Sequence, residues 1–191
     1  MSGGLVITEA REEDLEQLLN LYFSIYGNDY PLKIGLERNA TQQALADHQN
    51  YYWLVAKVTD GTIVGSCLFE LDWKYKIGKV SGVVVHRDHQ GKGISGRLVR
   101  EGSDKILNQQ VGINTLYTTT RTLSVVPQLM FLNNGYIPLG IFPNAHKIKE
   151  YETLTLMGAF RRGVLRKRAK VESVPPEVLP ILDIVNELLT Q

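Results

Sequence analysis

The residues best suited to chemistry lie in one stretch of the 191-residue chain, Val83 to Leu98. Its three branched apolar residues, Val83-Val84-Val85, are typical of the end of a buried strand. A polar turn follows, and Gly91 and Gly93 then precede a segment that can begin a helix. Glycine lets the backbone bend sharply and approach a ligand closely, and the start of a helix offers unpaired N–H groups. The stretch therefore predicts a binding site for a phosphate or pyrophosphate.

The same glycines match a second pattern, Gly91-x-Gly93-x-x-Gly96, which binds dinucleotides in parallel βαβ units. The strands before it form a meander instead, and the next predicted strand, 113–122, holds no acidic residue for the ribose hydroxyls. Arg121 in that strand can meet a 2′-phosphate, although a lone arginine in a strand is more often a surface or ion-paired residue. An NADP-dependent oxidoreductase is therefore the least favoured of three hypotheses.

The elements before the turn are expected to be a strand, two helices and three strands. The first strand covers residues 5–10, and apolar residues at helical spacing predict helices over 11–26 and, more weakly, 36–49. Strands over 51–58 and 62–73 flank Asp60-Gly61, a strong hairpin signal, and a strand over 76–85 leads into the turn. Three successive strands with short links predict an antiparallel meander.

After the turn, the pattern predicts a helix over 94–110, a strand over 113–122 and a short helix over 127–133. Two final strands, 136–142 and 151–160, are expected to be joined by a loop that contains Pro143-Asn144.

The last thirty residues have a different character and are treated as an extension, 161–191, of a domain that covers 1–160. The basic residues of 161–170 can contact nucleic acid or acidic phosphates of a ligand, but no aromatic residue lies among them, which favours a solvated linker. Pro175-Pro176 then precede a helix, 177–189, with an apolar stripe. That stripe must be buried against its own domain or against a partner subunit, so a homodimer is one expectation.

Composition narrows the class of protein. The formal net charge of +1 gives no general attraction to nucleic acid or membrane. The single cysteine, Cys67, excludes an internal disulfide, and four histidines without the H-x-x-x-H spacing make a zinc enzyme an unfavoured reading. We see neither a signal peptide nor a long apolar run at the start of the sequence, and we expect a cytoplasmic protein without a metal cofactor.

The turn also carries a family resemblance. Val83-x-Val85 followed by Gln90-x-x-Gly93-x-Ser95 resembles the acyl-CoA-binding motif of the GNAT (Gcn5-related) N-acetyltransferase superfamily, which runs Gln or Arg, two residues, Gly, one residue, then Gly or Ala. The element order and the later segment from Ser124 to Tyr136 are similar to this family over roughly residues 5–160. The resemblance implies an α+β fold in α/β/α layers, with a mixed, mostly antiparallel central sheet flanked by helices and followed here by a C-terminal helical extension.

The resemblance also implies a site for acetyl-CoA or another acyl-CoA as co-substrate. In this fold the strand before the turn separates from its neighbour, and its free backbone groups bond the pantetheine arm while the turn holds the pyrophosphate. Ser95 stands where Gly or Ala is usual, and Ser124 stands where the family often has Asn. The implied cofactor-binding residues are Val83, Val84, Val85, Gln90, Gly91, Lys92, Gly93, Ile94, Ser95, Gly96 and Ser124.

The catalytic groups are less clear than the cofactor site. Phe131 occupies the place of the tyrosine that often protonates the departing thiolate, and phenylalanine has no proton to give. Many relatives carry a glutamate as general base on the strand before the motif, where this chain has Lys79-Val80-Ser81-Gly82. Glu70, on the neighbouring strand, is the best substitute, and Tyr117 and His86 are weaker candidates. His146 is a candidate on the substrate side.

We therefore expect an N-acyltransferase that moves an acetyl or other acyl group from acyl-CoA to a primary amine on a small molecule or peptide. Direct attack by the amine in a ternary complex is preferred to an acyl-cysteine, because Cys67 lies on an apolar strand face. The alternative from another class is a regulatory module that holds acyl-CoA without catalysis.

Overall fold

A seven-stranded sheet forms the centre of the computed structural model, which describes residues 4–27, 32–109, 112–147 and 150–190. The strand order is β1-β2-β3-β4-β5-β7-β6, and only β4 and β5 pair in parallel. The predicted mixed, mostly antiparallel sheet is confirmed. The strands are β1 (Val6–Glu9), β2 (Tyr51–Lys57), β3 (Ile63–Asp72), β4 (Ile77–Val85), β5 (Thr115–Arg121), β6 (Ile137–Lys147) and β7 (Tyr151–Phe160).

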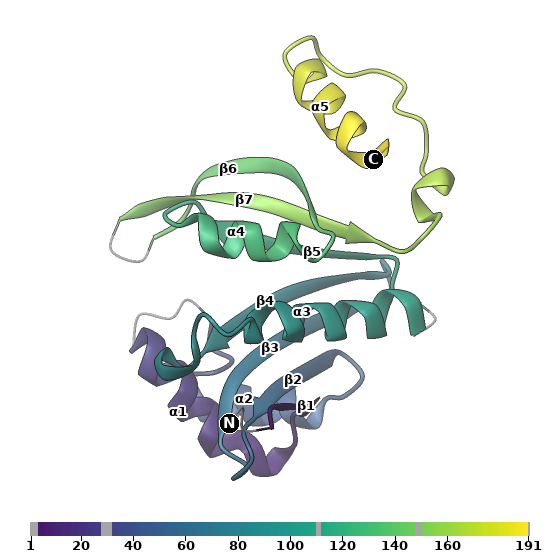
Figure 1. Cartoon of the computed structure of the whole chain (residues 1–191). Coiled ribbons are helices and arrows are strands. Elements are labelled where there is room, and N and C mark those ends of the chain that lie inside the picture. The colour runs from purple at the N-terminus through teal and green to yellow at the C-terminus, as the bar shows by residue number, and fades with distance from the viewer. Residues whose placement is uncertain (1–3, 28–31, 110–111, 148–149, 191) are drawn as a thin grey trace.

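Helices cover both faces of this sheet (Figure 1). On one face, Leu18 and Tyr22 pack with Leu45 against side chains of β2, β3 and β4. On the other face, Leu98 packs with Phe131 against a second buried cluster. The longer helices are α1 (Leu15–Tyr26), α2 (Arg38–Ala46), α3 (Ile94–Asp104), α4 (Val125–Leu132) and α5 (Leu179–Thr190). The short segments are η1 (Glu12–Asp14), η2 (Arg87–His89), η3 (Lys105–Gln109) and η4 (Val164–Lys167).

The sheet opens between β4 and β5. These strands pair only over Ile77–Lys79 and Thr115–Tyr117. The hydroxyl of Thr118 then donates to the carbonyl of Val80 at 2.9 Å, and beyond that point no ladder joins the two strands in the described part of the chain. β4 continues to pair with β3 as far as Val85, so its other edge is left open beside the glycine turn. The ribbons diverge there in Figure 1.

One element differs from its prediction in a way that matters for the site. β6 continues from Ile137 to Lys147 through Pro143-Asn144, where the sequence predicts a loop. The register with β7 is irregular between Phe142 and His146, and Asn144 has a φ of 52°. Proline is tolerated because β6 is an edge strand, where a missing N–H breaks no ladder. The longer strand carries His146 to a position opposite Glu152 of β7.

The chain ends in α5, which contacts β6 and has no buried residue. Leu179, Ile181 and Ile184 remain exposed on it. The predicted helix over 94–110 is divided into α3 and the π-helical η3, and its last residue, 110, lies outside the described residues. Within the described ranges no helix is both long and apolar enough to span a membrane.

Candidate active site

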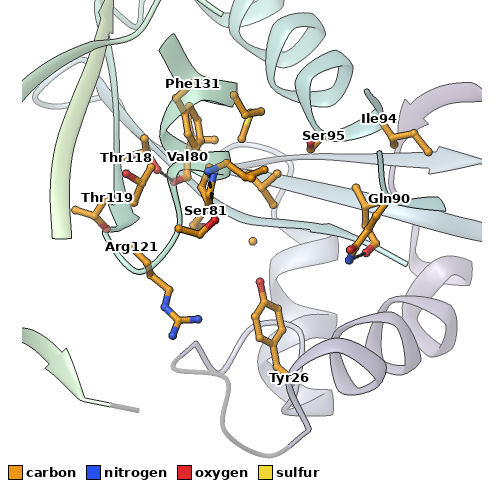
Figure 2. A pocket seen from close by; sticks show the side chains of 18 of the residues that line it. Tyr26, Val80, Ser81, Gln90, Ile94, Ser95, Thr118, Thr119, Arg121 and Phe131 are labelled. Carbon is orange, nitrogen blue, oxygen red and sulfur yellow. Dashed lines mark hydrogen bonds between the residues drawn. The ribbon is translucent and has the colours of Figure 1, made fainter. Parts of the chain in front are cut away.

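A cavity of about 820 Å³ fills the opening between β4 and β5. Its walls come from the end of α1, from β4 and the glycine turn, from the first turn of α3, and from β5, α4, β6 and β7. Figure 2 shows Gln90 and Ser95 on one side of this space, Arg121 and Tyr26 on another, and Phe131 above it. The elements that the sequence separates are therefore brought together around one cavity.

The glycine turn presents a row of free backbone donors to this cavity. In the described structure, the N–H groups of residues 91–96 donate to no protein atom, and the first bonded N–H is that of Arg97, which donates to the carbonyl of Gly93 at 3.1 Å. Gly91 and Gly93 have φ values of 74° and 73°, which only glycine adopts without strain. A Cβ at either position would meet nothing within 4 Å, so the space over the turn is open to a ligand.

Most of the predicted cofactor residues line the cavity: Val83, Val85, Gln90, Gly91, Gly93, Ile94, Ser95 and Ser124. The Gln90 amide donates to the carbonyl of Val85 at 3.0 Å and so lies along the open strand edge. Lys92 donates from its ammonium group to the carbonyl of Asp88 at 2.9 Å. The side chain of Val84 is 3% exposed and belongs to the core under α1 and α2, whereas Gly96 lies one residue beyond the lining. Contact of any of these eleven residues with a cofactor stays a prediction.

Phe131 is 3% exposed and meets the ring of Tyr136 edge to face, with the centroids 4.9 Å apart. The hydroxyl of Tyr136 bonds the hydroxyl of Ser103 at 2.8 Å, and burial raises the pKa of this phenol. Tyr136 is therefore held inside the core and does not replace the missing acid. Ser124 begins α4, and its hydroxyl accepts from the N–H of Val126 at 3.3 Å.

Glu70 lies one side chain behind the cavity wall. Ser81 lines the cavity, and its hydroxyl donates to the Glu70 carboxylate at 2.9 Å. The ammonium group of Lys79 lies 4.0 Å from the same carboxylate. Glu70 does not line the cavity itself, and the Ser81 hydroxyl connects its carboxylate to the cavity wall.

A second polar cluster was not foreseen from the sequence. Nε and Nη2 of Arg121 donate to the two carboxylate oxygens of Glu152 at 2.5 and 2.6 Å. Nε2 of His146 lies 3.7 Å from Oε2 of Glu152 and has no hydrogen-bond partner among the residues that the structure describes. Glu152 is 5% exposed, and the hydrogen bonds from Arg121 hold the pKa of its carboxyl below the usual range. Arg121 and His146 both line the cavity.

The comparisons with known proteins agree with this geometry. The model of the acetyltransferase (GNAT) family matches residues 13–126. The chain belongs to the GNAT acetyltransferase family. The match covers the meander and the glycine turn, and it ends at the start of α4. No curated protein matches the chain.

Solved GNAT structures share the fold at low sequence identity. An acetyltransferase of this family from Streptococcus pneumoniae is 20% identical, with a TM-score of 0.70 over 82% of this chain and 99% of that one. A spermidine N-acetyltransferase from Vibrio cholerae in complex with CoA and spermine is 15% identical, with a TM-score of 0.69 over 84% and 98%. A ribosomal-protein-S5-alanine acetyltransferase from Vibrio fischeri is 14% identical, with a TM-score of 0.71 over 83% and 94%.

The remaining candidates of this GNAT chain lie in ordinary structural roles. Cys67 is fully buried, and burial strongly raises the pKa of its thiol, so it is a poor nucleophile. His86 accepts from the N–H of Asp88 at 3.4 Å and caps η2, and Tyr117 does not line the cavity. No three potential metal ligands come together anywhere in the ranges that the structure describes.

Proposed function

We propose that this GNAT protein transfers an acyl group, most simply acetyl, from acyl-CoA to a primary amine by direct attack in a ternary complex. The observation that carries the proposal is the opening between β4 and β5 beside the free N–H groups of residues 91–96. A pyrophosphate is the ligand that such a turn suits best. An open strand edge of the length left on β4 suits an extended amide-containing arm.

The cofactor and the amine would approach from opposite faces of the sheet. The free N–H groups and Ser95 lie at the start of α3, so the cofactor would approach along α3 and α4. Residues of β5 alternate between faces, and Leu116 points into the core under α3. Arg121 therefore lies on the opposite face, with α1. The amine would enter there and meet the thioester in the opening.

An amine arrives mostly as its ammonium form and must lose a proton before it attacks. Glu70 is the proposed general base, acting through the hydroxyl of Ser81, which already donates to it. The departing thiolate is a stable anion at neutral pH relative to an alkoxide, so no phenol is needed at Phe131. Positioning and polarisation of the thioester carbonyl by backbone N–H groups would supply most of the rate.

The cellular setting stays a prediction. The acceptor is proposed to be a small molecule or peptide amine in the cytoplasm, where a chain with one buried cysteine needs no oxidising compartment. The homodimer, the division at residue 160 and the absence of nucleic-acid or membrane partners are likewise expectations, and light scattering of the purified chain tests the first of them.

The function is tested by following free thiol when the protein is given acetyl-CoA and a panel of amines. CoA and NADPH are titrated separately by calorimetry. We expect CoA binding and amine-dependent thiol release. CoA binding without release on any amine would favour a non-catalytic module, and NADPH binding without CoA binding would favour an oxidoreductase.

The cofactor site is tested by Gly93→Glu. Its side chain would occupy the space over the turn and place a negative charge beside the phosphates, so we expect loss of measurable CoA binding. Gly61→Glu is the matched control, because Gly61 also has a left-handed φ, 85°, and open space around it, but lies in the β2–β3 hairpin. Each variant carries a similar backbone cost of about 1 kcal/mol. Equal CoA affinity in the two variants would refute the site.

A further inference from the structure

The charged side chains that line the cavity are all basic. Among the described lining residues none is aspartate or glutamate, and the ionisable ones are Tyr26, Lys79, His89, Arg121 and His146. Lys79 is partly neutralised by Glu70 behind the wall. Arg121 is likewise paired with Glu152, which does not line the cavity. The described lining therefore offers an anionic group cationic N–H donors and offers an ammonium group no carboxylate.

Arg121 is the basic residue best placed to contact the acceptor substrate. It ends β5 on the α1 face, the side proposed for the amine, and Figure 2 shows its guanidinium beside Tyr26. Both residues line the cavity. Its side chain remains 44% exposed. Because Nε and Nη2 bond Glu152, the Nη1 edge stays available, with no protein acceptor among the described residues.

The surrounding residues fix the direction of that edge. Glu152 lies almost fully buried on β7 and holds the guanidinium plane with two hydrogen bonds. Nε2 of His146 lies 3.7 Å from Oε2 of Glu152, the oxygen that also accepts from Nε of Arg121. A guanidinium held in this way is preorganised for a planar anion, since little side-chain freedom is lost when the anion binds.

We propose that the acceptor is an amine that also carries a carboxylate, as an amino acid does, and that Arg121 binds this carboxylate through its Nη1 edge. The inference rests on the proposed acyl transfer and names the class of its acceptor. Arg121 is thus a specificity-determining residue. Polyamines, the acceptors named for one of the structural neighbours, would bring extra ammonium groups against Arg121 and are disfavoured here.

The test compares acceptors that differ only in the carboxylate. L-Phenylalanine is paired with phenethylamine and L-leucine with isoamylamine, spermidine serves as the polycation, and the full set of L-amino acids completes the panel. Thiol release gives kcat/KM for each, and calorimetry measures acceptor binding to the protein–CoA complex. We expect each carboxylate to raise kcat/KM by about tenfold to a hundredfold, the value of a charge-assisted hydrogen bond.

Three variants assign the preference to Arg121. Removing the guanidinium alone would leave Glu152 buried without its partner, so the main variant is the double one, Arg121→Gln with Glu152→Gln, which replaces the ion pair by two amides. It should lose the preference for the carboxylate and keep its affinity for CoA. Glu152→Gln alone leaves the guanidinium charge uncompensated and should keep or strengthen the preference. Arg121→Lys keeps the charge without the planar edge and should fall between them.

The outcomes separate the two proposals. Turnover of phenethylamine or spermidine as fast as of the amino acids, or a preference that survives in the double variant, overturns the inference and leaves acyl transfer standing. Arg121-dependent binding of amino acids without thiol release supports the inference and overturns the transfer. If no amine binds and no amine causes thiol release, both proposals are overturned.

Discussion

At the scale of single residues, Glu70 is the proposed proton acceptor. Its carboxylate lies behind the cavity wall and accepts a hydrogen bond from Ser81, which lines the cavity. Glu70→Gln removes the base, and Ser81→Ala removes the hydroxyl that links it to the amine. We expect both to lower kcat at neutral pH by about 10²–10⁴-fold, the usual contribution of a general base, with CoA affinity unchanged. Steady-state kinetics across pH measures this.

The control for that prediction is Asp72→Asn. Asp72 lies on the same strand face as Glu70, two residues further along β3, but it is exposed and bonds only the N–H of Tyr75. It should leave kcat unchanged. A Glu70→Gln protein as active as Asp72→Asn would remove Glu70 from the mechanism.

The pair formed by Arg121 and Glu152 predicts how stability depends on pH. Because the hydrogen bonds from Arg121 lower the pKa of Glu152 in the folded protein, the pair contributes its full stabilisation above the ordinary glutamate pKa of about 4.3. That contribution is lost as the pH falls through the lower folded pKa. Urea unfolding from pH 7 to pH 3 should therefore show a steeper acid loss in the native chain than in the double variant with Gln at both positions. Parallel curves would contradict this assignment.

The glycine turn could be recognised from the sequence because the residues that form it are neighbours along the chain. Glycine at a left-handed φ and a helix start define a phosphate cradle within a few positions of one another. The cluster of Arg121, Glu152 and His146 was missed as a unit because it forms across three strands. Arg121 and Glu152 are 31 positions apart, and only the order β5-β7-β6 makes them neighbours. For Arg121 the sequence favoured a surface or ion-paired residue, and the structure shows an ion pair with Glu152 at the wall of the cavity.

At the scale of elements, α3 is fixed to β3 by a close contact at Gly102. A Cβ at this position would lie 2.2 Å from the buried ring of Phe69, so Gly102→Ala forces the helix away from the strand. We expect a loss of about 1–3 kcal/mol in the free energy of unfolding, measured by urea denaturation. Gly96→Ala in the same helix is the control, because its Cβ meets only the amide of Asn134 at 3.4 Å. It should be neutral or stabilising by about 0.5–1 kcal/mol, and equal losses in both would contradict the packing.

Most elements could be predicted from their periodicity and turns, and the exceptions have physical causes. β7 begins and ends at the predicted residues, since alternation and buried apolar residues both favour a strand there. β6 was predicted to stop before Pro143, because proline interrupts a strand in the middle of a sheet. Its place at the edge removes that constraint, and strand order is not encoded in local sequence.

At the scale of the whole molecule, the proposed function would place the two substrates on opposite faces of the sheet, meeting where β4 and β5 separate. The terminal extension lies outside this arrangement. Arg161, placed at the start of the extension, nevertheless bonds the carbonyls of Ile113 and Ile106 at 3.0 and 3.4 Å. These bonds tie Arg161 to the sheet domain, and the division at residue 160 stays a prediction.

Direct transfer of the acyl group from acyl-CoA to an amine is tested by mass spectrometry of a rapidly quenched reaction. The native chain and Cys67→Ala are mixed with acetyl-CoA, with and without an accepting amine. We predict that both proteins stay unmodified and that the acetyl group appears on the amine as an amide, one for each CoA released. An acetylated protein that forms without the amine and then passes its acetyl group to an added amine would contradict direct transfer.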